Sequence, residues 1–305
     1  MASTGTAVLA LDLGATKLAV GVGHADGEMT RVATAPTDAA DGAEAALARA
    51  LQLADGVYQE ELAAAGSIAA IGVASMGYTH TTHVELAPNV PGWNALRIPE
   101  ALAGAFPELP ATIGNDVHLA AQAEILWGSL QNVSDGIYLN LGSGVSAGIV
   151  CNGQLLSGAN GVAGEVGYSL LRGGPEERMA ADGATPFEDY FGGAGAARRL
   201  AATDLPGSVA ELLELDANPA AKAFIDELWT GIAMLAANLC SALNPSVLVL
   251  GGGYVRGDSG VLAHVSELVR RAVPYPPEVV RARFGGDASL RGAVASALSL
   301  AGVAR

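Results

Sequence analysis

Two segments of the chain combine glycine with hydroxyl, carboxyl or amide residues in the pattern of a phosphate-binding hairpin. Residues 11–17 read LDLGATK and residues 139–145 read LNLGSGV, and each tip lies between two apolar runs. Glycine lets backbone N–H groups approach an anion closely, and the hydroxyl of Thr16 or Ser143 adds a donor. Each copy alone could be an ordinary glycine turn. The repetition of the tip together with its flanking strands favours a pair of phosphate clamps.

Asp116 is the carboxylate best placed for general-base chemistry. A strand is predicted to end at Ile113 and a helix to span 117–127, so Asp116 lies at the N-terminus of that helix, which helps keep the carboxylate ionised. Asn115 beside it suits a hydroxyl group. Such a carboxylate could accept the proton of a hydroxyl that attacks a phosphoryl group, although an ordinary helix cap is the alternative. Asp12 could position Mg²⁺ or bond its own turn, and we favour the metal role.

The composition bounds the class of protein and its partners. The 305-residue chain is 50% apolar, enough for the cores of two domains. Its formal net charge of -15 disfavours nucleic acid and anionic membranes, because binding them relies on clustered Lys and Arg. The first apolar run lacks a basic region and contains Asp12, so neither a signal peptide nor a membrane span is expected and the protein is predicted to be cytoplasmic. Two cysteines argue against a disulfide framework or a cysteine-built metal site.

Strand-like and helix-like segments alternate along the chain without a disordered linker. This alternation predicts an α/β fold of two domains, residues 1–118 and 119–289, with the C-terminal helix 290–305 joined to the first domain. The other expected elements are helices over 43–65 and 220–243 and strands over 68–75 and 247–250.

The motifs of the chain, taken in order, resemble those of the bacterial ROK family, which groups sugar kinases with sugar-sensing repressors. They occupy residues 12–17, 88–93, 114–116, 142–144, 164–167, 244–253 and 290–293. The resemblance implies the actin-like ATPase (ribonuclease H-like) fold, with two α/β domains around a central cleft for ATP and sugar. It also matches Asp116 to the catalytic Asp of the family. A repressor would need a DNA-binding domain ahead of the first strand, which begins near Val8, so a kinase is favoured.

The same resemblance implies the ligand-binding residues. The cofactor is expected to be ATP with Mg²⁺, and no metal is assigned to protein ligands. The substrate positions are Gly77, Asn89, Asn115, Glu165, Tyr168 and Glu188. The nucleotide positions are Asp12, Gly14, Thr16, Lys17, Gly142, Ser143, Gly144, Gly251 and Gly252.

The chain departs from the family pattern at the zinc site. Typical members have a histidine after the Gly-Glu-x-Gly motif and a loop with three cysteines, which together bind a structural zinc. Here Tyr168 stands at the histidine position and the following loop, to Thr185, has no cysteine, so no zinc is expected. His80 and His83 have a spacing that a metal could use, but without a nearby third ligand we expect them to be surface residues.

The predicted function is therefore ATP-dependent transfer of the γ-phosphoryl group to a hydroxyl of a hexose or sugar-like polyol, with Asp116 as general base. Three alternatives stay open: a C7-cyclitol (carbasugar) kinase, a polyphosphate-using glucokinase, and a non-catalytic sugar-binding protein of the same fold. The low lysine content, with only Lys17 and Lys222, gives little support for a polyanion track. The expected partner is a small sugar or cyclitol, and the chain could form a homodimer.

Overall fold

The computed structural model describes residues 6–64, 66–87, 90–171, 177–215 and 218–303. The chain divides into two compact units, Met1–Trp127 with Asp287–Arg305, and Gly128–Gly286. The first unit therefore ends with a whole helix, α3 (Asp116–Trp127), rather than at residue 118 inside it. α9 (Ala288–Leu300) belongs to this first unit, where it packs against α3 and the sheet.

The first unit is built on a five-stranded sheet in the order β3-β2-β1-β4-β7. β1 (Ala7–Leu13) pairs antiparallel with β2 (Lys17–Gly23), and β2 pairs antiparallel with β3 (Met29–Pro36). On its other side β1 pairs parallel with β4 (Ile68–Ser75), which pairs parallel with β7 (Ala111–Asn115). The carboxyl ends of β1, β4 and β7 therefore meet at one edge of the sheet.

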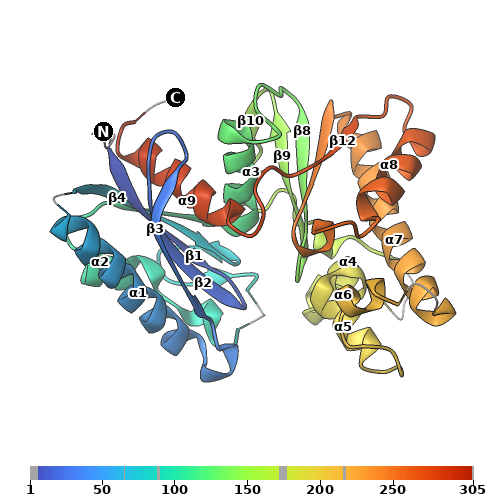
Figure 1. Ribbon diagram of the computed structural model, residues 1–305, viewed down its shortest axis with the longest axis horizontal. Helices are drawn as coiled ribbons and strands as arrows, with labels where there is room; N and C mark the ends of the chain where they lie inside the picture. Colours follow the sequence, from blue (N-terminus) through green and yellow to red (C-terminus); the bar gives the residue numbers. More distant parts are fainter. Residues whose placement is uncertain (1–5, 65, 88–89, 172–176, 216–217, 304–305) are drawn as a thin grey trace. The chain divides into compact units, whose positions relative to one another are not determined.

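Helices cover both faces of this sheet. α1 (Ala43–Ala63) and α2 (Ile98–Ala105) lie on one face and α9 lies on the other (Figure 1). Central strands that are covered on both faces read as continuous apolar runs, as in β1, because neither face meets water. α9 approaches the sheet so closely that a Cβ on Gly72 would lie 1.9 Å from the carbonyl oxygen of Ala293. A short hairpin, β5 (Tyr78–Thr79) and β6 (Val84–Glu85), follows β4.

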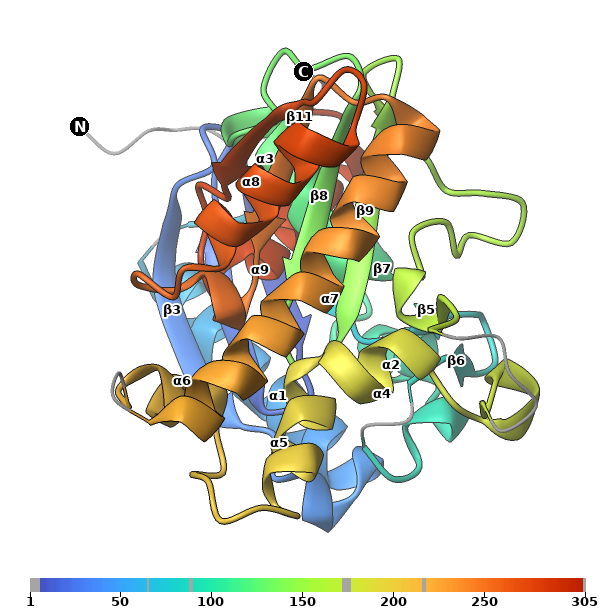
Figure 2. The same cartoon turned by 90° about the vertical axis from the view of Figure 1, so that its right-hand side faces the viewer.

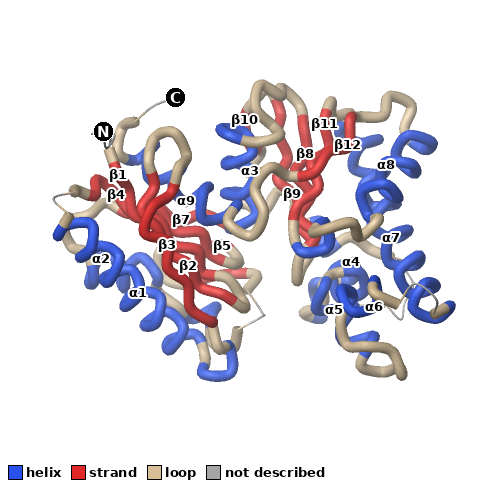
Figure 3. Tube along the Cα trace, viewed as in Figure 1, coloured by secondary structure: helices blue, strands red, loops and turns tan. Residues whose placement is uncertain are grey.

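The second unit repeats the strand order of the first. Its sheet runs β10-β9-β8-β11-β12, with β8 antiparallel to β9 and parallel to β11 (Figure 3). The repeated tip in the sequence thus reflects a repeated topology. The strands are β8 (Gly136–Leu141), β9 (Val145–Cys151), β10 (Gln154–Leu155), β11 (Val247–Gly251) and β12 (Glu278–Arg281).

α7 (Pro219–Leu243) is the central helix of the second unit and packs beside α8 (Val261–Ala272) (Figure 2). Among the described residues it is the one helix long and apolar enough to cross a membrane, and half of its most apolar window is buried inside the protein. Its buried residues, Leu228, Trp229 and Ile232 among them, belong to the core under the sheet. This burial is what the core helix of a globular unit requires.

Several elements differ from the sequence-based expectation. Two helices that the sequence analysis did not predict, α4 (Pro186–Phe191) and α5 (Gly193–Leu200), are separated by the extended backbone of Gly192. The expected strand ending at Ile113 continues to Asn115, and the next helix follows at once. The remaining elements were not anticipated: β3, α2, the β5–β6 hairpin, α6 (Val209–Leu213), α8 and β12.

Candidate functional site

The first part of the site lies at the carboxyl edge of the first sheet. The register places Leu13 of β1 beside Ser75 of β4, and Ser75 beside Asn115 of β7. Asp12 precedes this row and Asp116 follows it directly in the chain. Open α/β sheets bind ligands outside the carboxyl ends of their strands, and these two carboxylates lie at that position.

Asp12 and Asp116 influence each other electrostatically. The pKa of Asp12 is raised from 3.8 to about 7, first by burial and then by the negative charge of Asp116, while Lys17 opposes both effects. The two predicted acidic residues are thus brought together, and Lys17 lowers the pKa of Asp12 by less than burial and Asp116 raise it. Carboxylates at such a position are the ligands that a divalent cation such as Mg²⁺ prefers.

Asn115, not Asp116, caps α3. The Asn115 Oδ1 atom accepts hydrogen bonds from the backbone N–H groups of Val117 (3.0 Å) and His118 (3.1 Å), which is the geometry of an N-cap. Asp116 occupies the first turn, where its Oδ1 also accepts from the Val117 N–H. The Asn115 Nδ2 atom donates to the carbonyl of Gly77 at 3.3 Å and retains a second hydrogen for a ligand. Because Asn115 caps the helix, Asp116 is not needed as the cap. Asp116 still lies in the first turn, where the helix dipole favours a negative charge.

The first glycine hairpin is held by Thr37, a residue that the sequence analysis did not identify. The buried Thr37 hydroxyl donates to the carbonyl of Gly14 at 2.7 Å, and its N–H donates to the carbonyl of Thr16 at 3.1 Å. These two hydrogen bonds hold the carbonyl groups of Gly14 and Thr16 in place at the tip of the first hairpin. Thr37 follows the end of β3, so its role depends on a strand pairing that no local motif signals.

The second glycine hairpin, at Gly142–Gly144, is supported by α5. The first N–H groups of this helix, those of Gly193 and Ala194, donate to the carbonyls of Gly142 and Ser143, both at 2.9 Å. Gly252 also lies against this hairpin, because a Cβ there would lie 2.4 Å from the Leu141 backbone. The second unit thus brings together five predicted nucleotide residues: Gly142, Ser143, Gly144, Gly251 and Gly252.

Three predicted substrate residues gather in the second unit. Burial raises the pKa of Glu188, and the negative charge of Glu165 raises it as well. The Val145 N–H donates to the Glu188 Oε2 atom at 2.9 Å, and this hydrogen bond lowers the pKa. The pKa of Tyr168 is also raised by burial and then by Glu165 and Glu188. Because Glu165 acts on the pKa of Glu188, and both act on the pKa of Tyr168, the three side chains lie near one another. They form a partly buried polar surface of two carboxyls and a phenol.

Glu188 also lies against the second hairpin. A Cβ added to Gly144 would lie 2.3 Å from its carboxylate oxygen Oε2. Glycine is needed here for the close approach rather than for a left-handed backbone. Asn89, another predicted substrate residue, lies outside the described residues.

The residues fit a Mg²⁺-bound nucleotide but not the zinc of the resembled family. Mg²⁺ is bound through one or two carboxylates plus phosphate oxygens, and the carboxylate of Asp12 suits that donor set. At the family's zinc position Tyr168 offers a phenol, and the chain's two cysteines are elsewhere, Cys151 in β9 and Cys240 buried in α7. These donors do not match the three cysteines and one histidine that bind zinc in typical members.

Comparisons with known proteins agree with the fold and the motifs. The chain is 26% identical over 278 residues to a glucokinase of Halalkalibacterium halodurans, covering 84% of this chain and 83% of that protein. It is 26% identical over 290 residues to an N-acetylmannosamine kinase of Salmonella heidelberg, covering 93% and 96%. The crystal structure of a ROK hexokinase from Thermus thermophilus superposes with a TM-score of 0.81 at 28% identity, covering 98% of this chain and all of that one.

The model of the ROK family matches residues 8–299, almost the whole described chain. Its structural neighbours are ROK sugar kinases, and the two sheets of identical strand order are those of the actin-like ATPase fold. The protein belongs to the ROK family.

Proposed function

We propose that the protein is an ATP-dependent sugar kinase in which Asp116 is the general base. The observation that carries this proposal is the pair of carboxylates, Asp12 and Asp116, at the carboxyl edge of the first sheet. Phosphoryl transfer needs little covalent chemistry from the protein and depends on positioning, charge neutralisation and a proton acceptor. The two carboxylates supply the last two requirements by different means.

Asp116 and Asp12 lie in different surroundings, and we assign them different roles. Asp116 lies in the first turn of α3, where the helix dipole favours its charged form. Asp12 has no helix behind it, and its pKa is raised to about 7. In the proposed mechanism Asp116 accepts the proton of the attacking sugar hydroxyl. Asp12 would hold the Mg²⁺ that accompanies the nucleotide, and the bound ion would supply positive charge at the phosphates.

The glycine hairpins are assigned to the phosphates. The residues assigned to this task are Gly14 and Thr16 in the first unit, and Gly142 to Gly144 with Gly251 and Gly252 in the second. The N–H groups of Gly14 and Gly142 close the hairpins by donating to the carbonyls of Lys17 (3.2 Å) and Gly144 (3.0 Å), so the phosphates are assigned to the other N–H groups of the tips. Lys17 is assigned to the same phosphates. Thr37 donates hydrogen bonds to the carbonyls of the first tip, and the first residues of α5 donate to those of the second. Both tips are therefore held in place before a ligand arrives.

The sugar is assigned to Gly77, Asn89, Asn115, Glu165, Tyr168 and Glu188. Carboxylates, a phenol and an amide suit a ring of hydroxyl groups, and a buried polar group left unpaired by the wrong sugar provides discrimination. We therefore propose a hexose or N-acetylhexosamine, the classes named for the relatives, as the acceptor. We also propose that the enzyme acts in the cytoplasm.

The test is ADP release by purified protein with ATP, Mg²⁺ and a panel of hexoses, amino sugars and cyclitols. The expected result is turnover with at least one hexose, which Asp116→Asn lowers by roughly 10² to 10⁴ at unchanged nucleotide affinity. Asp55→Asn, on the exposed side of α1, is the matched control and should leave turnover unchanged. A wild-type rate in Asp116→Asn would remove Asp116 from the mechanism, and turnover with polyphosphate alone would replace ATP as donor.

A further inference from the structure

The β5–β6 hairpin carries three potential metal ligands on one face. Its register pairs Tyr78 with Glu85 and Thr79 with Val84, so that His80 lies opposite His83 across a two-residue turn. The His80 N–H donates to the carbonyl of His83 at 2.8 Å and closes this turn.

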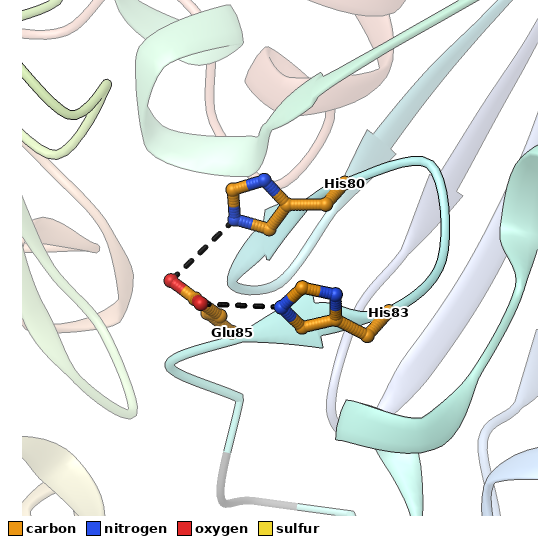
Figure 4. Close-up of side chains that lie close together, drawn as sticks. All are labelled: His80, His83 and Glu85. Atoms are coloured by element: carbon orange, nitrogen blue, oxygen red, sulfur yellow. Dashed lines mark hydrogen bonds and ion pairs between the residues drawn. The ribbon is translucent and has the colours of Figure 1, made fainter.

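Alternation along the two strands determines which side chains share a face. His80, His83 and Glu85 point to one side, whereas Val84, only 1% exposed, points to the core on the other. Figure 4 shows both imidazole rings turned toward the carboxylate of Glu85. All three side chains are exposed, so an ion can reach them from solvent.

The distances are close to those of a coordination sphere. The His80 Nε2 atom lies 3.4 Å from one Glu85 oxygen, and the His83 Nε2 atom lies 3.1 Å from the other. One ligand atom from each residue can be chosen so that all three lie within 4.8 Å of one another. Ligands at about 2.0–2.1 Å from a tetrahedral ion are about 3.3 Å apart. Small rotations of three exposed side chains therefore suffice to close the site.

We propose that His80, His83 and Glu85 bind a divalent transition-metal ion of the zinc, cobalt or nickel class. Two imidazoles and one carboxylate suit these ions, whereas Mg²⁺ and Ca²⁺ prefer oxygen ligands alone. Three protein ligands leave a coordination position for water. The two rings are already stacked, 4.7 Å apart and 16° from parallel, with both Nε2 atoms on the carboxylate side. This order reduces the entropy that binding would cost.

This proposal revises the expectation from the sequence, in which His80 and His83 had no third ligand. Glu85 is that ligand, and the hairpin register brings it to the two histidines. The site is separate from the zinc position of the resembled family, because that position is marked by Tyr168 in the second unit.

The base of the hairpin contacts residues of the proposed active site. The ring of Tyr78 meets the ring of His118 on α3 edge to face at 5.9 Å, and the carbonyl of Gly77 accepts from Asn115. An ion at the tip would cross-link the two strands that carry these contacts. The proposal nevertheless concerns ion binding alone and does not depend on the kinase activity.

The test uses untagged protein that has been treated with chelator and freed of nucleotide. Co²⁺ is titrated in while the visible absorption of the bound ion is recorded, and Zn²⁺ is then added in a calorimeter. We expect one ion per chain, an intense spectrum typical of four or five ligands, and displacement of Co²⁺ by Zn²⁺. His80→Ala, His83→Ala and Glu85→Gln should each weaken binding at least about tenfold, the lower end of what losing even an outer partner of a metal ligand costs.

His264→Ala is the matched control. This substitution removes one partly exposed imidazole from α8, where the His264 Nε2 atom lies 3.2 Å from the Thr230 hydroxyl. It should leave the metal titration unchanged. Circular dichroism checks that each variant is folded. Equal binding by the His80→Ala/His83→Ala double variant, or a spectrum identical to that of hydrated Co²⁺, would overturn the proposal.

Discussion

The raised pKa of Asp12 predicts that Asp12→Asn stabilises the protein in a pH-dependent manner. The pKa is about 7 in the folded protein and 3.8 ordinarily. Between these values the native state keeps a proton that the unfolded state has lost, so stability falls as pH rises toward 7 and is constant above it. The total penalty at high pH is about 4 kcal/mol, from about 1.4 kcal/mol per pKa unit.

The measurable quantity is the change of this penalty with pH. From about pH 5.5 to pH 8.5, wild type loses about 2 kcal/mol relative to Asp12→Asn, because one proton is released over about 1.5 units up to pH 7. Comparing the two proteins at each pH cancels the contributions of the other titrating groups to a first approximation. The pH-independent cost of burying an amide at this position remains in the stability difference at each pH, but it drops out of the change of that difference with pH.

Urea unfolding followed by tryptophan fluorescence is the assay, with chelator present to remove divalent ions. Trp93 and Trp127 belong to the first unit and Trp229 to the second, so a Trp229→Phe background makes the signal report the unit that contains Asp12. Asp55→Asn, on the exposed surface of α1, is the control for loss of a carboxylate. A stability difference that stays constant across the pH range would refute the raised pKa.

The same variant should lose kinase activity while it gains stability. An active site that gathers like charges is destabilised by them, and removing one charge relieves the strain at the expense of function. Loss of stability at high pH together with retained activity would contradict both parts of this reasoning.

Three further predictions concern the substrate-binding residues, two glycines and the zinc content. Tyr168→His should shift the ranking of accepted sugars more than the Kd for ATP, measured by competition assays and calorimetry, because the phenol contacts Glu165 and Glu188 electrostatically; an unchanged ranking would place residue 168 outside the pocket. Gly77→Ala should destabilise the first unit by more than the roughly 1–2 kcal/mol of a left-handed residue, since φ is 72° and a Cβ would lie 2.3 Å from the Glu85 carbonyl oxygen. Gly153→Ala, with φ 74° and open space around its Cβ, should show the left-handed cost alone, measured by urea unfolding of protein that keeps Trp229 as the reporter of the second unit. In the His80→Ala/His83→Ala variant, elemental analysis should find no stoichiometric zinc, because Tyr168 and a cysteine-free loop replace the family's ligands; stoichiometric zinc would reveal another site.

Local sequence patterns were sufficient for much of the fold and for the family. The repeated hairpins, β4 at 68–75 and the core helix α7 follow from apolar periodicity, glycine tips and caps, all of which act within a few residues. The family was recognised from motifs in order, and the fold follows from it. The short helices α4 and α5 on either side of Gly192 were not predicted, because packing against the hairpin at Gly142 helps to decide where one ends and the other begins.

What only the tertiary structure decided depends on pairing between distant segments. Asp12 lies on β1 and Asp116 follows β7 directly, and the parallel register of β1, β4 and β7 brings them together. Thr37 reaches the first hairpin through the pairing of β3 with β2, and Glu85 joins His80 and His83 through the register of a two-strand hairpin. A shift of one residue in either register would turn these side chains to the opposite face. The sequence by itself therefore determined which residues could perform the chemistry, whereas strand register decided which of them meet.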